Sequence, residues 1–250
     1  MSILHSFDSE SEAIINPAEA VQPVQDFPET VLSVFSEKFV HLLASSYRLE
    51  QVSYMTVGRT IPVFCFEYKG ERLGFYHSLL GGSASGALLE EIIAKGGKQI
   101  LFFGSCGSLD KTISSGNLIV PTHAYRDEGT SYHYLPPGDY LTIPTSARLA
   151  EIFTSMGVPF RQTRVWTTDS FYRETRKNRE MRKREGCSAV DMEYASVMAV
   201  GLFRKIPVYQ FLYTADCLDG SRWDPRILGK WPDELRQAVL RIALETAIRL

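Results

Sequence analysis

Two short segments place carboxylates directly after apolar strands. The first is Val190-Asp191-Met192-Glu193, and the second is Tyr213-Thr214-Ala215-Asp216. A carboxylate at the end of a buried strand is costly to place there, and in α/β proteins the carboxyl ends of strands surround the ligand crevice. We therefore expect a small-molecule site and its chemistry in a crevice beside these two segments.

Two glycine-rich segments indicate an anion site at the same edge. In residues 80–86, Gly82 lets the backbone approach a ligand, and the N–H groups of the following helix can face an anion. Residues 102–109 repeat the strand-then-glycine pattern, with Ser105 as a hydroxyl donor. A tight strand-to-helix turn explains the glycines of the first segment equally well.

Two further segments are rich in polar and aromatic groups. In residues 125–134, Arg126 either serves the crevice or pairs within its own loop. In residues 166–175, Phe171 or Tyr172 can stack on a heterocyclic base, or the same rings can pack in the core.

The length and composition fit one large α/β domain with a small-molecule ligand. The chain has 250 residues, of which 44% are hydrophobic and 22% charged, and one large domain accounts for them. A net charge of -2 argues against nucleic acid or an anionic membrane as partner. The four scattered cysteines and five histidines show no metal-ligand spacing, no leader or membrane span is evident, and we expect a cytoplasmic protein without metal or organic cofactor.

The predicted elements form a single α/β domain with a central mixed, mostly parallel sheet flanked by helices. Residues 1–28, which contain three prolines, are expected to form an irregular arm, and residues 29–250 the domain. Hydrophobic spacing predicts helices over 29–46, 84–96, 145–156, 176–185, 193–204 and 232–249. It predicts strands over 61–67, 72–79, 99–103, 117–121, 162–167, 188–192 and 207–214, with a hairpin turn at Lys69-Gly70-Glu71.

Several of these motifs together resemble one known family. Residues 104–107 (Gly-Ser-Cys-Gly), 126–134, 168–172, 191–193 and 214–216 occur in the order found in the nucleoside phosphorylase and uridine phosphorylase superfamily. The resemblance runs from about residue 59 to 225. It is strongest to the branch with a Trp-Thr-Thr-Asp-x-x-Tyr-Arg-Glu-Thr signature, which stands here at 166–175.

The resemblance implies phosphorolysis of a nucleoside to a free base and a (deoxy)ribose 1-phosphate. Glu193 is expected to hydrogen-bond the ribose hydroxyls, Met192 to pack against the sugar, and Asp216 to protonate the leaving base. Phosphate, the co-substrate, is assigned to Ser105 and Gly82. The base pocket is assigned to Phe171, Tyr172 and Gly107.

The chain departs from the family at the phosphate cations. Residues 15–19 stand where family members carry a Gly-Asp-Pro-x-x-Arg loop, and Phe102 replaces an arginine before the Gly-Ser-Cys-Gly motif. Arg59 matches an arginine that family members lend across a subunit boundary, which implies a homodimer or homohexamer. We expect Arg126 and Arg173 to replace the lost charges.

Two other functions stay open. Without phosphate cations, the protein is a nucleosidase that activates water through Glu19, Asp127 or Glu128, or a catalytically silent nucleoside-binding relative. Thr175 and Lys177 replace the glutamine and arginine with which uridine-cleaving members recognise their base. This difference, together with the aspartate at 216, favours purine over uridine.

Overall fold

The structure, a computed structural model, describes residues 2–5 and 7–250. None of the helices in these ranges is long and apolar enough to cross a membrane. With 3₁₀ helices written η, the order of elements is η1 (Ile3–His5), α1 (Pro17–Ala20), β1 (Thr30–Val34), α2 (Glu37–Ser46), β2 (Glu50–Val57), β3 (Arg59–Tyr68), β4 (Glu71–His77), α3 (Gly82–Lys95), β5 (Gln99–Ser108), β6 (Leu118–Asp127), α4 (Ser131–Tyr134), β7 (Tyr140–Thr142), α5 (Ser146–Ser155), β8 (Phe160–Thr168), η2 (Phe171–Arg173), α6 (Arg176–Arg184), β9 (Cys187–Asp191), α7 (Tyr194–Arg204), β10 (Val208–Cys217) and α8 (Asp233–Ala247).

One mixed sheet organises the molecule. In the described part of the chain its ten strands follow the order β10-β6-β8-β9-β5-β1-β4-β3-β2, with β7 beside β6. Because β10 also pairs with β5, the strands β5, β10, β6, β8 and β9 close into a ring. The predicted α/β domain with a mixed sheet is confirmed. Among the described strands, however, the pairings are five parallel and five antiparallel, because antiparallel contacts close the ring and add β2, β3 and β7 at the edges.

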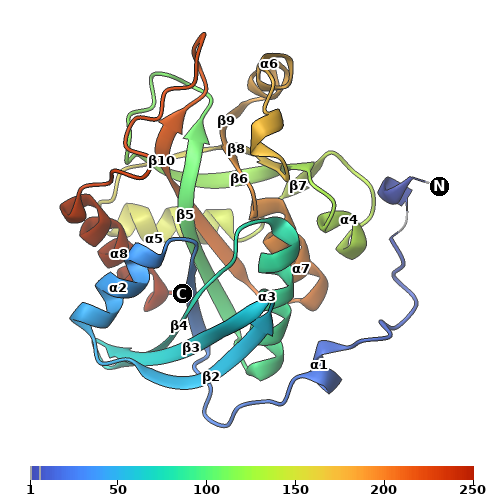
Figure 1. Ribbon diagram of the computed structural model, residues 1–250, viewed down its shortest axis with the longest axis vertical. Coiled ribbons are helices and arrows are strands. Elements are labelled where there is room, and N and C mark those ends of the chain that lie inside the picture. The colour runs from blue at the N-terminus through green and yellow to red at the C-terminus, as the bar shows by residue number, and fades with distance from the viewer. Residues whose placement is uncertain (1, 6) are drawn as a thin grey trace.

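Helices cover both faces of the sheet. Helices α3 and α7 pack on one side, and α2, α5 and α8 lie on the other (Figure 1). The strands supply alternating side chains to the two cores: Ile100 and Phe102 of β5 face the α3 and α7 side, whereas Leu101 and Phe103 face the opposite cluster. This two-sided burial explains why the central strands are apolar almost throughout.

The predicted helix over 29–46 is wrong in its first part. Residues 30–34 form β1, which pairs in parallel with β4 and β5, and only residues 37–46 are helical. Val31 and Leu32 are fully buried on opposite faces of the sheet. A short apolar run that is buried on both faces has no strand alternation, so its spacing is indistinguishable from that of a buried helix.

The other elements agree with the prediction to within a few residues at most ends. The hairpin at residues 69–71 is confirmed, with Lys69 and Gly70 at φ 51° and 85° between the paired strands β3 and β4. The edge strand β2 was not predicted, because it pairs only with β3 in this structure and most of its residues are at least partly exposed. The short elements β7 and α4 were not predicted either.

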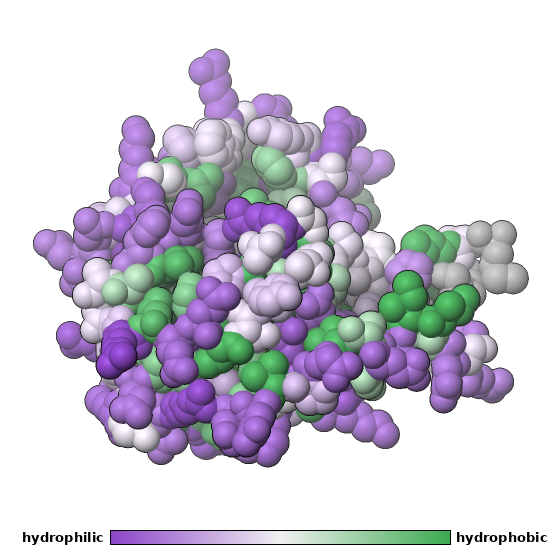
Figure 2. All heavy atoms as spheres, turned by 60° about the horizontal axis from the view of Figure 1, so that its bottom comes forward, coloured by the Kyte–Doolittle hydropathy of each residue, from purple (hydrophilic) through white to green (hydrophobic). Residues whose placement is uncertain are grey.

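The N-terminal segment before β1 runs along one side of the body (Figure 1). Figure 2 shows it projecting from the surface with apolar side chains on it. The large exposed apolar residues of this segment are Ile3, Leu4, Ile14 and Ile15.

Candidate active site

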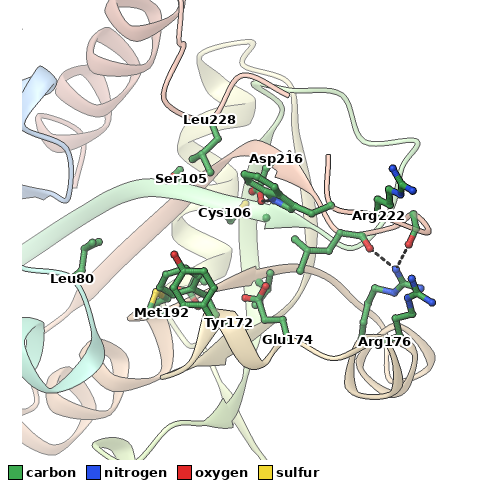
Figure 3. Close-up of a pocket in the computed structure, with 18 of the residues that line it drawn as sticks. Leu80, Ser105, Cys106, Tyr172, Glu174, Arg176, Met192, Asp216, Arg222 and Leu228 are labelled. Carbon is green, nitrogen blue, oxygen red and sulfur yellow. Dashed lines mark hydrogen bonds between the residues drawn. The ribbon is translucent and has the colours of Figure 1, made fainter. Parts of the chain in front are cut away.

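A pocket of about 800 Å³ opens where β5, β9 and β10 meet. Gly107 of β5 pairs with Val190 of β9, and Asp216 of β10 pairs with Gly107 from the other side. Figure 3 shows Leu80 and Met192 toward one end of the pocket, Asp216 and Glu174 on either side of its middle, and Arg176 and Arg222 at the far end. A concave volume of this size with a few polar groups is typical of a small-molecule site.

Glu193 is held at the junction of β9 and α7. Its side chain is 6% exposed, and its Oε1 accepts a hydrogen bond from the Gly81 N–H at 2.7 Å. The nearby Asp191 accepts from the N–H groups of Glu193 and Tyr194, at 3.2 and 2.7 Å, and so caps α7. Burial, followed by the charge of Asp191, raises the pKa of Glu193. Glu193 is therefore a positioned carboxyl in a dry part of the pocket.

A β-bulge directs Asp216 into the pocket. The register of β10 against β5 shifts between Thr214 and Asp216, so that one extra residue is accommodated. The Asp216 Oδ2 accepts a hydrogen bond from the indole N–H of Trp223 at 2.6 Å. Burial raises the pKa of Asp216, although the Trp223 hydrogen bond and Arg226 act in the opposite direction. Asp216 thus combines a pocket position with an increased tendency to hold a proton.

The small residues of β5 leave room for these groups. A Cβ on Gly107 would lie 2.6 Å from Leu218 Cδ1 and 3.3 Å from Asp216 Oδ1, so a larger residue there would have to displace the Leu218 side chain. Ser105, two residues earlier, is exposed and lines the same pocket. On the other wall, Phe171 and Tyr172 are 48% and 87% exposed, and their ring centroids lie 4.0 Å apart.

Of the residues assigned to the site from the sequence, seven line this pocket. They are Ser105, Gly107, Phe171, Tyr172, Met192, Glu193 and Asp216. The pocket lining does not include Arg59, Gly82, Arg126 or Arg173.

Arg126 supports its own loop. Its guanidinium is buried, donates to Ser131 Oγ and to the Pro136 carbonyl at 2.7 Å each, and lies 3.9 Å from the Tyr132 ring centre. The expectation that Arg126 replaces a lost phosphate cation does not hold, because its donors are already used. Arg173, at the end of η2, is exposed and lies outside the pocket lining, so its assignment to phosphate stays a prediction.

Gly82 is needed for helix packing. A Cβ on this residue would lie 2.0 Å from Ser196 Oγ, because α3 and α7 approach closely there. Its neighbour Gly81 supplies the N–H that holds Glu193. The glycines of this segment are therefore explained by the turn and the helix contact rather than by a phosphate ligand.

A family comparison identifies the chain. A family model described as the phosphorylase superfamily matches residues 29–250. The chain belongs to the phosphorylase superfamily. A purine nucleoside phosphorylase of the DeoD type from an Exiguobacterium species is 22% identical over 227 residues, covering 89% of this chain and 94% of the relative. The uncharacterized protein R802 of Acanthamoeba polyphaga mimivirus is 26% identical over 160 residues, which is 64% of this chain and 60% of R802.

A solved structure shows the same fold. The purine nucleoside phosphorylase from Toxoplasma gondii, crystallised with immucillin-H, superposes with a TM-score of 0.77 at 21% identity and covers 96% of this chain and 99% of that one. This chain and that purine nucleoside phosphorylase therefore share one fold.

Along the described chain, the first residue that lines the pocket is Phe35, which directly follows β1. Its ring stacks against buried Phe102 at a centroid distance of 6.0 Å, and a Cβ on Gly104 would touch it at 2.8 Å. The segment 15–19, compared above with the family's phosphate loop, instead lies in the exposed arm and contains most of α1. Phe35 therefore lines the pocket with Phe102 buried behind it, and Phe102 stands where the resemblance implies an arginine.

The pocket contains polar residues that the sequence did not single out. Arg176 and Arg179 of α6 donate to the carbonyls of Ser221 and Gly220, at 2.6 and 2.9 Å, and so tie the loop after β10 to the helix. The charged composition of residues 176–184 predicts a helix that faces solvent, yet in the structure these arginines contact the loop. The spacing of Arg176, Arg179 and Lys183 along one side of the helix could have indicated the contact, since Lys183 also pairs with Asp219 of that loop.

The described residues hold no group of three or more His, Cys, Asp or Glu side chains that could bind a metal ion. All four cysteines are buried and free. The polar groups of the pocket lining include carboxyls, arginines, the hydroxyls of Ser105, Tyr172 and Ser221, and the Trp223 indole N–H, and these can bind a neutral polar ligand and move protons.

Proposed function

We propose that this protein cleaves the N-glycosidic bond of a purine nucleoside by phosphorolysis, giving the free base and a (deoxy)ribose 1-phosphate. The observation that carries the proposal is the convergence of Glu193, Met192, Asp216 and Ser105 on one pocket. Membership of the phosphorylase superfamily and the similarity to a purine nucleoside phosphorylase support the same reaction.

In this proposal the sugar is held by Glu193. The Gly81 N–H orients its carboxyl, and the remaining lone pairs accept hydrogen bonds from the ribose hydroxyls. Met192 follows β9 directly and packs against the sugar ring. Burial strengthens these hydrogen bonds, because water does not compete for the same groups.

The base is bound between Asp216 and the two aromatic rings. Phe171 and Tyr172 offer exposed apolar faces on which a planar base can stack. Phosphate attacks C1′ while the bond from C1′ to the base breaks. The electron pair moves into the base, and protonated Asp216 donates its proton to the purine N7. The raised pKa of Asp216 favours the protonated form that this step requires.

The phosphate half of the site is completed in this proposal by a second subunit. Ser105 lies at the pocket, whereas Arg176 and Arg222 lie at its far end. The remaining arginine of the lining in the described residues, Arg179, donates to the Gly220 carbonyl of the loop that carries Arg222. Arg59 begins β3 and its guanidinium lies 3.3 Å from His77 Nδ1 at the end of β4. Because Arg59 is exposed, it can reach the Ser105 region of a neighbouring copy in a homodimer or homohexamer.

Hydrolysis by water is the second candidate, and the far position of the pocket arginines favours it. The carboxylates considered as its base do not line the pocket, however. Glu128 accepts from Ser196 Oγ at 2.6 Å, Asp127 accepts from the Trp166 indole N–H at 2.8 Å, and Glu19 lies in the exposed helix α1. We therefore rank phosphorolysis first.

Product analysis tests the proposal. The purified protein is incubated with adenosine or inosine, with and without phosphate, and the base and sugar products are separated. Base release that requires phosphate and yields ribose 1-phosphate supports phosphorolysis. Free ribose formed equally without phosphate would replace it with hydrolysis. Nucleoside binding without base release under either condition would identify a silent relative and refute both.

A further inference from the structure

One carboxyl in the pocket has no role in the mechanism above. Glu174 lies between η2 and α6, where its N–H donates to the Phe171 carbonyl at 3.2 Å and the next residue, Thr175, caps α6. Its side chain lines the pocket together with Asp216 (Figure 3). Within the described chain this carboxyl has no hydrogen bond and no ion pair. Partly buried carboxyls normally have partners, so an unpartnered one in a ligand pocket points to a partner on the ligand.

The surroundings of Glu174 raise the pKa of its carboxyl. Burial, followed by the charge of Asp216, raises the pKa of Glu174 to about 7. The charged groups that line the same pocket are Asp216 from β10, Asp191 and Glu193 from the β9–α7 junction, Arg176 and Arg179 from α6, and Arg222 from the loop after β10. Both of the α6 arginines donate to loop carbonyls instead of to Glu174.

A purine presents two neighbouring polar groups that two carboxyls of this pocket could bind. On the purine, N7 and the 6-substituent lie on the same edge, where adenine presents an acceptor and an amino donor and 6-oxopurines present two acceptors. If Asp216 serves N7, a second carboxyl on the base side of the pocket is available to the neighbouring 6-substituent. We propose that Glu174 determines specificity at this position by accepting from a 6-amino group when ionised and donating to a 6-oxo group when protonated. This inference rests on the proposed function, because it requires a purine in the pocket.

A pH-dependent preference follows from this chemistry. Ionised Glu174 offers only acceptors, so adenine is favoured at higher pH, and protonated Glu174 offers an O–H donor, so hypoxanthine is favoured at lower pH. Titration of Asp216 affects both free bases alike, because both carry the same N7, and titration of Glu193 acts on the sugar position, which neither free base occupies. The ratio of the two affinities therefore isolates Glu174 from the other carboxyls.

Binding of free bases tests the inference separately from catalysis. The dissociation constants of adenine and hypoxanthine are measured by titration calorimetry between about pH 6 and pH 8 for the wild type, Glu174→Gln and Glu151→Gln. Glu151 is an exposed glutamate of α5 and serves as the matched control. No turnover occurs, since each base is supplied without a sugar phosphate.

We expect the preference for adenine over hypoxanthine to rise by about 10- to 100-fold across this range in the wild type and in Glu151→Gln, as a single titration near neutrality gives. In Glu174→Gln the ratio should be flat, because an amide does not titrate. A wild-type change below about twofold, or a slope that persists in Glu174→Gln, would overturn the inference. Failure of the proposed function has a different result, namely no phosphate-dependent base release from either nucleoside.

Discussion

Replacing Asp216 by asparagine tests the proton donor at the leaving base. The two side chains have the same size, and the amide Oδ1 can still accept the Trp223 indole hydrogen bond, which spans 2.6 Å in the structure. The substitution therefore preserves the contact with the loop and removes the acidic proton. General acid catalysis contributes about 10²- to 10⁴-fold, or about 2.7–5.4 kcal/mol in the barrier. We expect the single-turnover rate with a purine nucleoside to fall by that factor.

The assay needs a substrate that does not require the proton. A 4-nitrophenyl riboside has a leaving group that departs as an anion, so Asp216→Asn should slow its cleavage by less than about 10-fold. Asp233→Asn, at the exposed start of α8, provides the matched control and should behave as the wild type. Purine turnover that survives undiminished would show that the proton comes from elsewhere. Equal losses on both substrates would assign Asp216 to binding instead.

Three further predictions concern the phosphate site, the helix contact and the buried carboxyl. Arg59→Ala should raise the KM for phosphate by about 10-fold or more in steady-state assays, because a charge-assisted bond is lost; an unchanged KM would remove Arg59 from the site. Gly82→Ala should lower the free energy of unfolding in urea by about 1–3 kcal/mol, since its Cβ would lie 2.0 Å from Ser196 Oγ; wild-type stability would show that the helices separate without cost. The raised pKa of Glu193 means that the wild type loses stability as pH rises above the ordinary glutamate range, so calorimetry should show a gain in Tm for Glu193→Gln that grows with pH. A gain that is equal at low and high pH would contradict this origin.

Much of the fold after residue 59 could be predicted because its apolar spacing is local. Strand β10 and helix α7, for example, have long apolar runs, and their burial agrees with the pattern. The failure at β1 has a physical cause: Val31 and Leu32 are buried on both sides by β4, β5 and the helices, which are remote in sequence. Whether a five-residue segment such as Thr30–Val34 forms a strand depends on the strands that pair with it, and these are distant in sequence.

The candidate site divides in the same way. Glu193 and Asp216 could be located because one follows the apolar strand β9 and the other lies at the end of the apolar strand β10, and each strand determines where the side chain lies. The positions of the arginine side chains could not be predicted, because a long, flexible cationic side chain can donate to any acceptor within its reach. Arg126 finds the carbonyls of residues 135–138 within its own loop, and Arg176 finds a carbonyl of a loop 45 residues away. Only the three-dimensional contacts decide between these outcomes.

The partners of the three pocket carboxyls account for their different proposed roles. Glu193 is bound by a backbone N–H of the turn before α3, so its position is fixed and suits a sugar that must be held in one orientation. Asp216 is bound by Trp223, an exposed side chain on a loop, so its hydrogen bond can exchange for one to a base. Glu174 has no protein partner in the described chain, and a substituent on the base can supply one. Burial raises the pKa of all three carboxyls, so burial does not distinguish their roles. The hydrogen-bond partner of each carboxyl does, because it suits Glu193 to binding the sugar, Asp216 to donating a proton and Glu174 to selecting the base.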